Sequence, residues 1–392
     1  MLFTKIYGTG SYVPETVRTN SDLEKMLGTD PETGTTDKWI MERVGIKERR
    51  IANVYETHEF MAARAIRQAI WNAIDNIGNT NTIKLERLSI ILTGNTHIPG
   101  LIPCEASKYS VMPDACAFDV ITEKLEPIEN ACKFLFDAYT IIGNGGIQIK
   151  SERAPDWKTQ GIVYQHKQDG LAQILAREMG MKAEKSFDLA TGCASFNYGL
   201  ALADALIRQE PQYIVVAAVD KMLDVTNPKD RSTVVLFGEL AGAAVLGPSE
   251  MPGFLTHSLH TDGLQRDAIV MKQAEGWDKP YFWQDGPAVY KWAVRTMREQ
   301  ARFAINASNG RVVLVPHQAN PRMLKEAFKD RLFNRVADSI ITGDLYGNSS
   351  TASIAHALDV GFRTERIRPE DYVGILGFGA GLSDGVNVYR NI

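Results

Sequence analysis

The sequence predicts an α/β fold of two duplicated halves that stack into a layered α/β/α/β/α body. Short apolar strands alternate along the chain with segments of helical periodicity, a pattern typical of sheets whose faces are covered by helices. Two local patterns also recur in the same order. The run RLSIIL at 87–92 resembles RVVLVP at 311–316, and Phe-Gly followed by Val occurs at 237–245 and again at 378–386. This matching order indicates a duplication.

The duplication divides the chain into two parts. We expect an N-terminal half over residues 1–252 and a C-terminal half over residues 253–392. The regular pattern weakens between Asn95 and Gln168, where one helix near 128–139 and a turn at 142–146 are predicted.

Composition excludes several classes of function. The 392 residues are 44% hydrophobic and 23% charged, ordinary values for a globular protein with a sizeable core. The 43 basic and 47 acidic residues give a net charge of −4 without any run of like charge, which argues against nucleic acid as a partner. The N-terminus lacks the apolar core of a signal peptide, and no apolar run approaches a membrane span. Because the four cysteines form no CxxC pair, we expect a cytoplasmic protein without a membrane partner.

Apolar periodicity predicts most helices and strands. In the first half they are helices at Glu59 to about Asp75 and about Gly170 to Met179, strands at Leu88–Leu92 and Tyr213–Val219, and a hairpin-like pair around Val234–Leu246. In the second half they are helices at Ala288 to about Ile305, Pro321 to about Val336 and Ser349–Phe362, and strands at Val312–Val315, Val373–Leu376 and Val386–Tyr389.

One stretch, residues 187–209, has the features of a nucleophile at the turn between a strand and a helix. Phe187–Leu189 alternates as a strand end does, small residues follow, and Cys193 comes just before a helix that Pro211 ends. Free amides and the helix dipole favour an anion there, so we expect them to favour the thiolate. Small neighbours also let a substrate carbonyl reach the sulfur and a backbone N–H. The alternative is an inert buried cysteine.

Three further motifs follow Cys193 in the sequence. They are VPHQAN with His317, GNSS with Asn348, and the glycine-rich turn GFGAG at 377–381. Together with Cys193 they resemble the active-site motifs of β-ketoacyl-acyl carrier protein synthase III, a condensing enzyme of the thiolase superfamily. The resemblance covers most of the chain except residues 95–168, and it implies a thiolase-like fold.

The resemblance implies a decarboxylative Claisen condensation. Cys193 would take an acyl group from a coenzyme A thioester, with the backbone N–H groups of Cys193 and of the Gly379–Ala380 turn as the oxyanion hole. His317 and Asn348 would donate hydrogen bonds to the carbonyl of malonyl-acyl carrier protein and stabilise the enolate that forms as carbon dioxide leaves. Taken singly, His317 is more often a structural hydrogen-bonding group and Asn348 a helix cap.

Other residues match positions that bind substrate in this family. Trp39, Arg43 and Arg231 match contacts to the adenine and phosphates of coenzyme A, since an indole stacks on a base and guanidinium groups pair with phosphate. Asn320 matches an asparagine near the pantetheine. Core packing is the alternative for Trp39, and solvated charge is the alternative for the two arginines.

A basic stripe follows His317. Arg322, Lys325 and Lys329 occupy positions i, i+3 and i+7 of the predicted helix, where they suit the docking of an acidic carrier protein. An ordinary solvated face is the alternative.

The resemblance implies a homodimer that uses coenzyme A thioesters as substrates and needs no metal or other cofactor. His257, His260 and Asp262 are residue types that bind metals. The stretch THSLHTDG that contains them resembles instead a strand and turn of the family that binds no metal.

The chain departs from the family in three places. Ser195 replaces a typical glycine, and Asp384 stands where an aromatic residue is common. Roughly seventy residues, at about 99–168, form an insertion before the nucleophile where the family has a short loop, and so long a loop is usually functional. Its three cysteines have no metal-site spacing and are interpreted as packing. We expect the insertion to reshape or cover the acyl pocket, so the acyl donor need not be acetyl-CoA.

Three other kinds of protein share some of these features. A related thiolase-fold enzyme would make an ester, an amide or a specialised ketone, but an acyltransferase needs no enolate, so Asn348 favours condensation. A papain-like Cys/His/Asn hydrolase shares the chain order, but CGSCW is absent around Cys193. A non-catalytic subunit of a condensing complex usually lacks the nucleophile.

Overall fold

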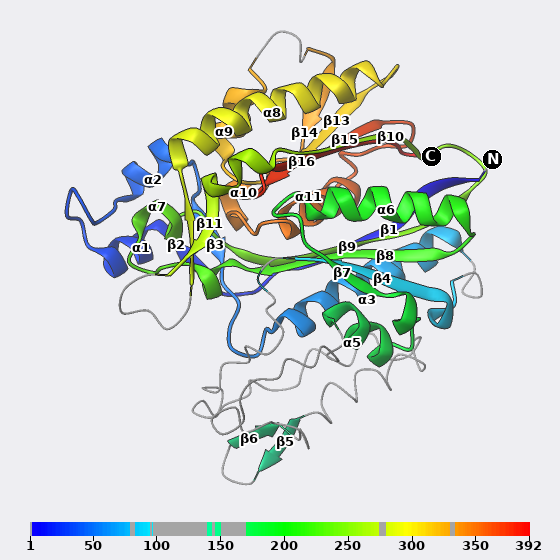
Figure 1. Ribbon diagram of the computed structural model, residues 1–392, viewed down its shortest axis with the longest axis horizontal. Helices are drawn as coiled ribbons and strands as arrows, with labels where there is room; N and C mark the ends of the chain where they lie inside the picture. Colours follow the sequence, from blue (N-terminus) through cyan, green and yellow to red (C-terminus); the bar gives the residue numbers. More distant parts are fainter. Residues whose placement is uncertain are drawn as a thin grey trace.

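The computed structural model describes residues 2–78, 83–94, 96, 139–142, 146–149, 170–273, 280–329 and 334–392. In these residues two five-stranded sheets lie one above the other, with helices between them and on both outer faces (Figure 1). The helices between the sheets are α6 (Ser195–Gln209) and α11 (Ala352–Arg363). Those outside are α3 (His58–Ile77) and α5 (Leu171–Glu178) on one face, and α8 (Gly286–Asn306) and α9 (Pro321–Ala327) on the other. The predicted α/β/α/β/α body is confirmed.

The two sheets have the same topology. The first has the order β1 (Phe3–Tyr12), β9 (Glu239–Ser249), β8 (Tyr213–Lys221), β4 (Leu88–Thr93), β7 (Phe187–Leu189). The second has the order β10 (Phe254–Thr261), β16 (Ser383–Arg390), β15 (Tyr372–Gly379), β13 (Val312–Pro316), β14 (Val336–Ser339). In each sheet the first two strand pairs are antiparallel and the last two are parallel. The structure therefore confirms that two α/β halves repeat one fold.

Shorter elements gather at one end of the two sheets (Figure 1). They are α1 (Asn20–Leu27), α2 (Asp37–Arg43), α7 (Arg231–Val234), α10 (Gly343–Tyr346), β2 (Val17–Thr19) with β3 (Glu48–Arg50), and β11 (Ile269–Lys272) with β12 (Tyr281–Gln284). Within the insertion β5 (Tyr139–Ile142) pairs with β6 (Gly146–Ile149) around the predicted turn. The helix predicted near 128–139, the three cysteines and most of the insertion lie outside the described residues.

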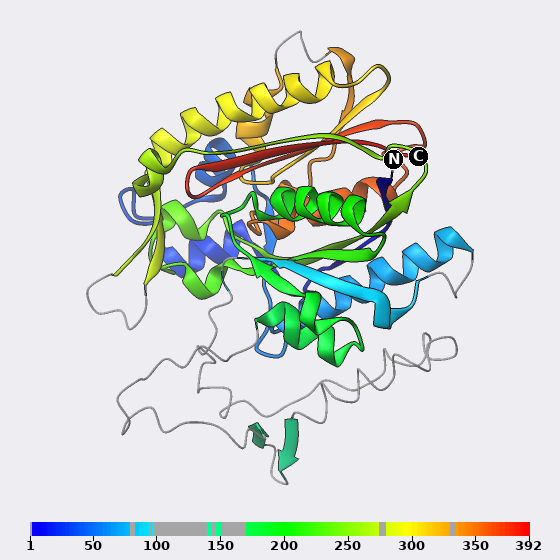
Figure 2. The ribbon, with the colours of Figure 1, turned by 45° about the vertical axis from the view of Figure 1, so that its right-hand side comes forward.

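The two central helices are apolar on several sides because sheets pack against them from above and below (Figure 2). In α11 every residue from Ala352 to Asp359 is buried. The helix α6 approaches the first sheet closely at Gly199, since a Cβ added there would lie 2.8 Å from Val216 Cγ1. The turns that precede α6 and α11 therefore lie between the sheets, in the interior of the molecule.

Two predicted elements are wrong in extent. The hairpin-like pair expected around 234–246 is a single strand, β9, preceded by the short helix α7. A Cβ at Gly238 would lie 2.0 Å from the Tyr346 carbonyl oxygen, so the second half packs where a hairpin partner would lie. The helix expected to reach Val336 ends at Ala327. Val336 instead begins β14, whose pairing with β13 overrides the local helical period.

His356, on α11, is a buried polar residue without an evident role in the site. It is 1% exposed, and neither ring nitrogen has a hydrogen-bond partner among the residues that the structure describes. Its ring packs edge-on against Tyr346 at 4.6 Å between centroids. Burial, with smaller contributions from the charges of Arg363 and Arg50, lowers the pKa of His356 to about 3. The folded protein therefore holds this imidazole neutral.

We expect replacement of His356 with phenylalanine to make the folded protein less sensitive to acid. A pKa below the unfolded value of about 6.5 gives stability that is present above pH 6.5 and is lost as the pH falls toward 3. Without this imidazole, the unfolding free energy should fall less steeply as the pH decreases, by up to about 1.4 kcal/mol per pH unit. Urea denaturation at pH 7, 6 and 5 measures the slope. A wild-type slope in His356→Phe would contradict the expectation.

Candidate active site between the two sheets

Cys193 lies in a tight turn between β7 and α6. The preceding residue, Gly192, has φ of +63°, and a Cβ there would lie 2.5 Å from the backbone nitrogen of Ala380. From the second half, Gly379 approaches so closely that its Cβ would lie 2.2 Å from the backbone nitrogen of Cys193. Only glycine fits such positions. The two turns therefore pack backbone against backbone, and the amide of Cys193 lies beside the 379–380 turn.

Ser195, the departure from the family glycine, ties this turn together. Its hydroxyl donates to the Gly192 carbonyl (2.6 Å) and accepts from the backbone N–H of Thr191 (2.7 Å). The side chain is fully buried. Two backbone groups beside the nucleophile are thus satisfied by a side chain that glycine lacks.

The Cys193 side chain is a thiol in this environment. Burial raises the pKa of Cys193 to about 12, the charge of Asp220 adds to the rise, and a hydrogen bond from Ser350 opposes it. The sequence-based expectation that the helix start favours the thiolate is wrong for the resting site. The first helical residue, Ser195, comes two positions later, and the dipole effect is confined to the first turn. Burial between the sheets outweighs it.

His317 follows the last residue of β13 and is 1% exposed. Burial lowers its pKa to about 3, and a hydrogen bond with the Ser350 backbone opposes this by less, so the imidazole is neutral. Its Nδ1 lies 2.8 Å from Ser353 Oγ, and that oxygen accepts a hydrogen bond from the backbone N–H of Gln318 (3.1 Å). The ring lies edge-on to Phe378 at 5.2 Å between centroids. These contacts fix the ring plane.

Asn348 is held by the other half of the protein. Its N–H donates to the Leu236 carbonyl (2.8 Å), and its carbonyl accepts from the N–H of Gly238 (3.0 Å). The side-chain Oδ1 accepts from the backbone N–H of Ser350 (2.8 Å), which leaves Nδ2 as the outward donor. Thr351, not Asn348, occupies the N-cap of α11. The helix-cap interpretation is therefore not what the structure shows.

One segment, residues 348–353, contacts the groups of both halves. Its Ser350 hydroxyl donates to Sγ of Cys193 (3.3 Å), and its Ser353 hydroxyl contacts His317. Of this segment only Asn348 was predicted from the sequence to be catalytic. The Asn-x-Ser spacing, typical of a turn in which the asparagine side chain accepts a backbone N–H, was the available signal for Ser350. No local signal pointed to Ser353.

The residues expected to bind coenzyme A form one cluster on α2 and α7. The guanidinium carbon of Arg231 lies 5.0 Å, and that of Arg43 5.7 Å, from the centre of the Trp39 ring. Arg231 also donates to the carbonyls of Pro31 (2.9 Å) and Gly34 (2.7 Å). The structure thus places an indole and two guanidinium groups together, as the sequence-based assignment requires.

Asn320 and the basic stripe lie around α9. Asn320 is the N-cap of this helix, and its Oδ1 accepts from the backbone N–H of Arg322 (2.9 Å). The Arg322 guanidinium donates to a backbone carbonyl of α2. Lys325 is exposed on α9, whereas Lys329 lies beyond the helix end and pairs with Glu326 (2.5 Å). The three cations therefore do not share one helix face.

The two histidines considered for metal binding each lie beside a different aspartate. Nε2 of His257 lies 3.1 Å from Asp204 Oδ2, and Nδ1 of His260 lies 3.4 Å from Asp384. Asp262 instead caps the 3₁₀ turn at 263–268. In the described part of the chain no three His, Cys, Asp or Glu side chains form a metal-binding group. No helix there is long and apolar enough to cross a bilayer.

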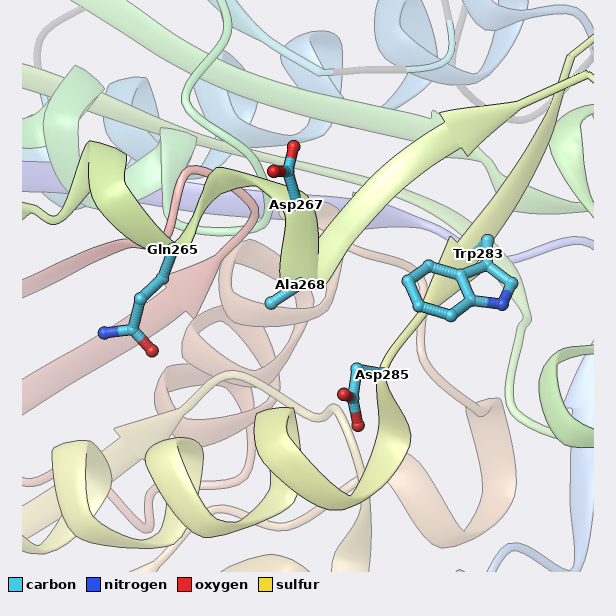
Figure 3. Close-up of a pocket in the computed structure, with 5 residues that line it drawn as sticks. All are labelled: Gln265, Asp267, Ala268, Trp283 and Asp285. Carbon is cyan, nitrogen blue, oxygen red and sulfur yellow. The ribbon is translucent and has the colours of Figure 1, made fainter.

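An open pocket lies at the start of α8 (Figure 3), and none of the catalytic candidates lines it. It is lined by Gln265, Asp267, Ala268, Trp283 and Asp285. The carboxylate of Asp285 caps α8 by accepting from a backbone N–H (3.1 Å). No cysteine, serine or threonine lines this pocket.

Comparison with known proteins shows the family to which this chain is similar. The model of the 3-oxoacyl-[acyl-carrier-protein (ACP)] synthase III family matches residues 187–263, and that of its C-terminal part matches residues 310–390. The β-ketoacyl-[acyl-carrier-protein] synthase III of Sodalis glossinidius (strain morsitans) is 31% identical over 99% of this chain and 100% of its own length. The chain belongs to the β-ketoacyl-[acyl-carrier-protein] synthase III family.

Solved structures related to this synthase III family agree with the fold. The priming β-ketosynthase of the R1128 polyketide pathway superposes with a TM-score of 0.71 at 26% identity, covering 99% of this chain and 96% of its own. The synthase III of Aquifex aeolicus VF5 gives 0.67 at 27% identity, covering 99% of both chains. The chain is therefore a thiolase-superfamily acyltransferase with synthase III-like condensing activity in fatty acid biosynthesis. The family and fold predicted from the motifs are confirmed.

Proposed function

We propose that Cys193 accepts an acyl group from an acyl-CoA, and that this acyl group condenses with malonyl-acyl carrier protein to give a β-ketoacyl thioester and carbon dioxide. The main support is the segment 348–353, which contacts Cys193 through Ser350 and His317 through Ser353. Through this segment the nucleophile of the first half and the polar groups of the second half form one site.

In the acylation step the Cys193 sulfur attacks the thioester carbonyl, and negative charge develops on the carbonyl oxygen. The backbone N–H groups of Cys193 and of Gly379 or Ala380 are the proposed donors to that oxygen. The close packing of the two turns supports this assignment, since a side chain at either glycine would separate them.

In the condensation step His317 and Asn348 are the proposed donors to the malonyl carbonyl. Ser353 Oγ accepts from Gln318 N–H, so its own proton is available to Nδ1 of His317, which leaves the imidazole proton on Nε2. Asn348 presents Nδ2 because Oδ1 is engaged. Two neutral donors stabilise the enolate more than the ground-state carbonyl.

The Trp39, Arg43 and Arg231 cluster is the proposed nucleotide site of the acyl-CoA. Replacing Arg231 with alanine should raise KM for acyl-CoA about tenfold and leave kcat unchanged, because a charge-assisted contact to phosphate is lost away from the reacting atoms. Steady-state kinetics at saturating malonyl-carrier protein measures both.

Two controls separate binding from damage to the loop that Arg231 supports. Acyl-pantetheine thioesters lack the nucleotide, so the Arg231→Ala enzyme should use them as well as wild type does. The exposed Lys229→Ala variant removes a charge two positions away and should behave as wild type. Equal losses with acyl-CoA and acyl-pantetheine would rule out the nucleotide contact.

Further assignments rest on the resemblance. Asn320 is proposed to lie near the pantetheine through its Nδ2, while Arg322, Lys325 and Lys329 are proposed to dock the acidic carrier protein. We propose a cytoplasmic homodimer, halves that divide at residue 252, and no metal or cofactor other than the coenzyme A thioester as substrate.

Intact-mass spectrometry tests the proposed reaction. The protein is incubated with a panel of acyl-CoA thioesters, and malonyl-carrier protein is then added while carbon dioxide release is followed. An acyl adduct that leaves as a β-ketoacyl product with carbon dioxide release is expected. An adduct transferred to an alcohol or amine without carbon dioxide release would establish an acyltransferase instead. The absence of any adduct would overturn the proposal.

A further inference from the structure

We infer that Ser350 is a further catalytic residue, whose hydroxyl stabilises the Cys193 thiolate during acylation. This inference rests on the proposed function. The Ser350 Oγ lies 3.3 Å from Cys193 Sγ in donor geometry, and it reaches the sulfur from a position 157 residues away in the sequence. Ser350 is 1% exposed, so little water competes for this contact.

The surroundings of Cys193 disfavour its thiolate form. Burial and the charge of Asp220 both raise the pKa of Cys193, and the Ser350 hydroxyl is the first of the two opposing influences. A hydrogen bond to the charged form lowers the pKa of an acid, and hydrogen bonds to anions are stronger than those to neutral acceptors. The Ser350 hydroxyl therefore favours the reactive form of the sulfur.

The backbone of Ser350 is set for this contact. Its φ of +52° lies in the left-handed region, which is uncommon for residues other than glycine. In this conformation its N–H donates to Asn348 Oδ1 (2.8 Å) while its hydroxyl reaches Cys193. Such conformations cluster at functional sites and persist where surrounding contacts hold them. Ser350 thus serves the nucleophile through its side chain and Asn348 through its backbone.

The acylation step balances without another reactant. The Cys193 sulfur forms a bond to the acyl carbon as the bond from that carbon to the coenzyme A sulfur breaks. The thiol proton of Cys193 ends on the departing coenzyme A thiol. Ser350 keeps its proton and donates only a hydrogen bond.

The test is the pH dependence of alkylation at Cys193, measured with iodoacetamide from pH 7 to 10 and quantified on the Cys193 peptide by mass spectrometry. Wild type should react about tenfold faster per pH unit, since only the thiolate reacts. Ser350→Ala and Ser350→Gly should react about tenfold more slowly at each pH, as a rise of one pKa unit requires. Glycine suits the positive φ, so that variant guards against misfolding.

The matched control is Ser349→Ala. The Ser349 hydroxyl is buried and has no hydrogen-bond partner among the described residues, so its removal should leave alkylation at the wild-type rate. Unchanged alkylation in both Ser350 variants would overturn the inference.

Two further readouts separate this role from structural damage and from the proposed function. Carbon dioxide release from malonyl thioester should stay within about threefold of wild type in the Ser350 variants, because the N–H that holds Asn348 remains. A loss equal to the loss of alkylation would overturn the catalytic role. Slower alkylation in these variants, with no acyl-CoA adduct in wild type, would support thiolate stabilisation and refute the proposed acyl transfer.

Discussion

Replacing Cys193 with alanine abolishes the acyl adduct and lowers condensation by at least about 10⁴-fold, because no other group can accept the acyl chain at this position. The expectation follows from the turn between β7 and α6, where the Cys193 amide lies beside the 379–380 turn and the sulfur meets the Ser350 hydroxyl. Intact mass with the acyl-CoA panel measures the adduct, and product formation from malonyl-carrier protein measures condensation.

The same variant should still decarboxylate malonyl-carrier protein. His317 and Asn348 are held by Ser353 and by the Ser350 backbone, and neither contact involves the Cys193 side chain. Cys193→Ser is the matched control, since it keeps the size and a hydrogen-bonding partner for Ser350 but offers a weaker nucleophile. An acyl adduct in Cys193→Ala, mapped to any other residue, would contradict the assignment of the nucleophile.

The order of helices and strands was predictable because each core element has a clear apolar period. The helices α3, α5 and α8 and the strands β4, β8, β13 and β15 lie where periodicity places them, within a few residues. The pattern failed at β9 and after α9, where pairing between distant segments decides the structure. Strand pairing of that kind leaves little trace in a local window of sequence.

The identity of the candidate nucleophile was predictable, but its chemical state was not. The sequence shows that Cys193 precedes a helix. It does not show that α6 is sandwiched between two sheets, or that Asp220 at the end of β8 faces the same site. Burial depends on the whole fold, and here it reverses the direction of the pKa shift. Ser350 was missed for the same reason, since its contact joins positions 157 residues apart.

The second large effect concerns His317 and Asn348. Replacing either with alanine should lower condensation about 10²–10³-fold, the usual loss for one donor to a developing oxyanion. Acylation of Cys193 should stay within about threefold of wild type, because the proposed oxyanion hole for that step is backbone. Single-turnover carbon dioxide release and adduct formation by mass measure the two steps separately. The double variant should lose less than the product of the two single losses.

Asn348→Asp tests the orientation of the amide more sharply than alanine does. Aspartate keeps the size and the acceptor for the Ser350 N–H, but it replaces Nδ2 with an oxygen that repels the enolate. We expect Asn348→Asp to release carbon dioxide more slowly than Asn348→Ala. The reverse order would mean that Nδ2 does not face the substrate.

The pH profile of carbon dioxide release tests the state of His317. Its pKa of about 3 lies well below the ordinary value, so the imidazole stays neutral as the pH falls from 7.5 to 5.5. The wild-type rate should therefore be level across that range. An imidazole of ordinary pKa, about 6.5, would become protonated below that pH. If only the neutral form supports the reaction, the rate of carbon dioxide release would then fall by up to about tenfold per pH unit. Such a fall, absent from a His317→Ala control that reports buffer effects on the carrier protein, would contradict a neutral His317 as donor.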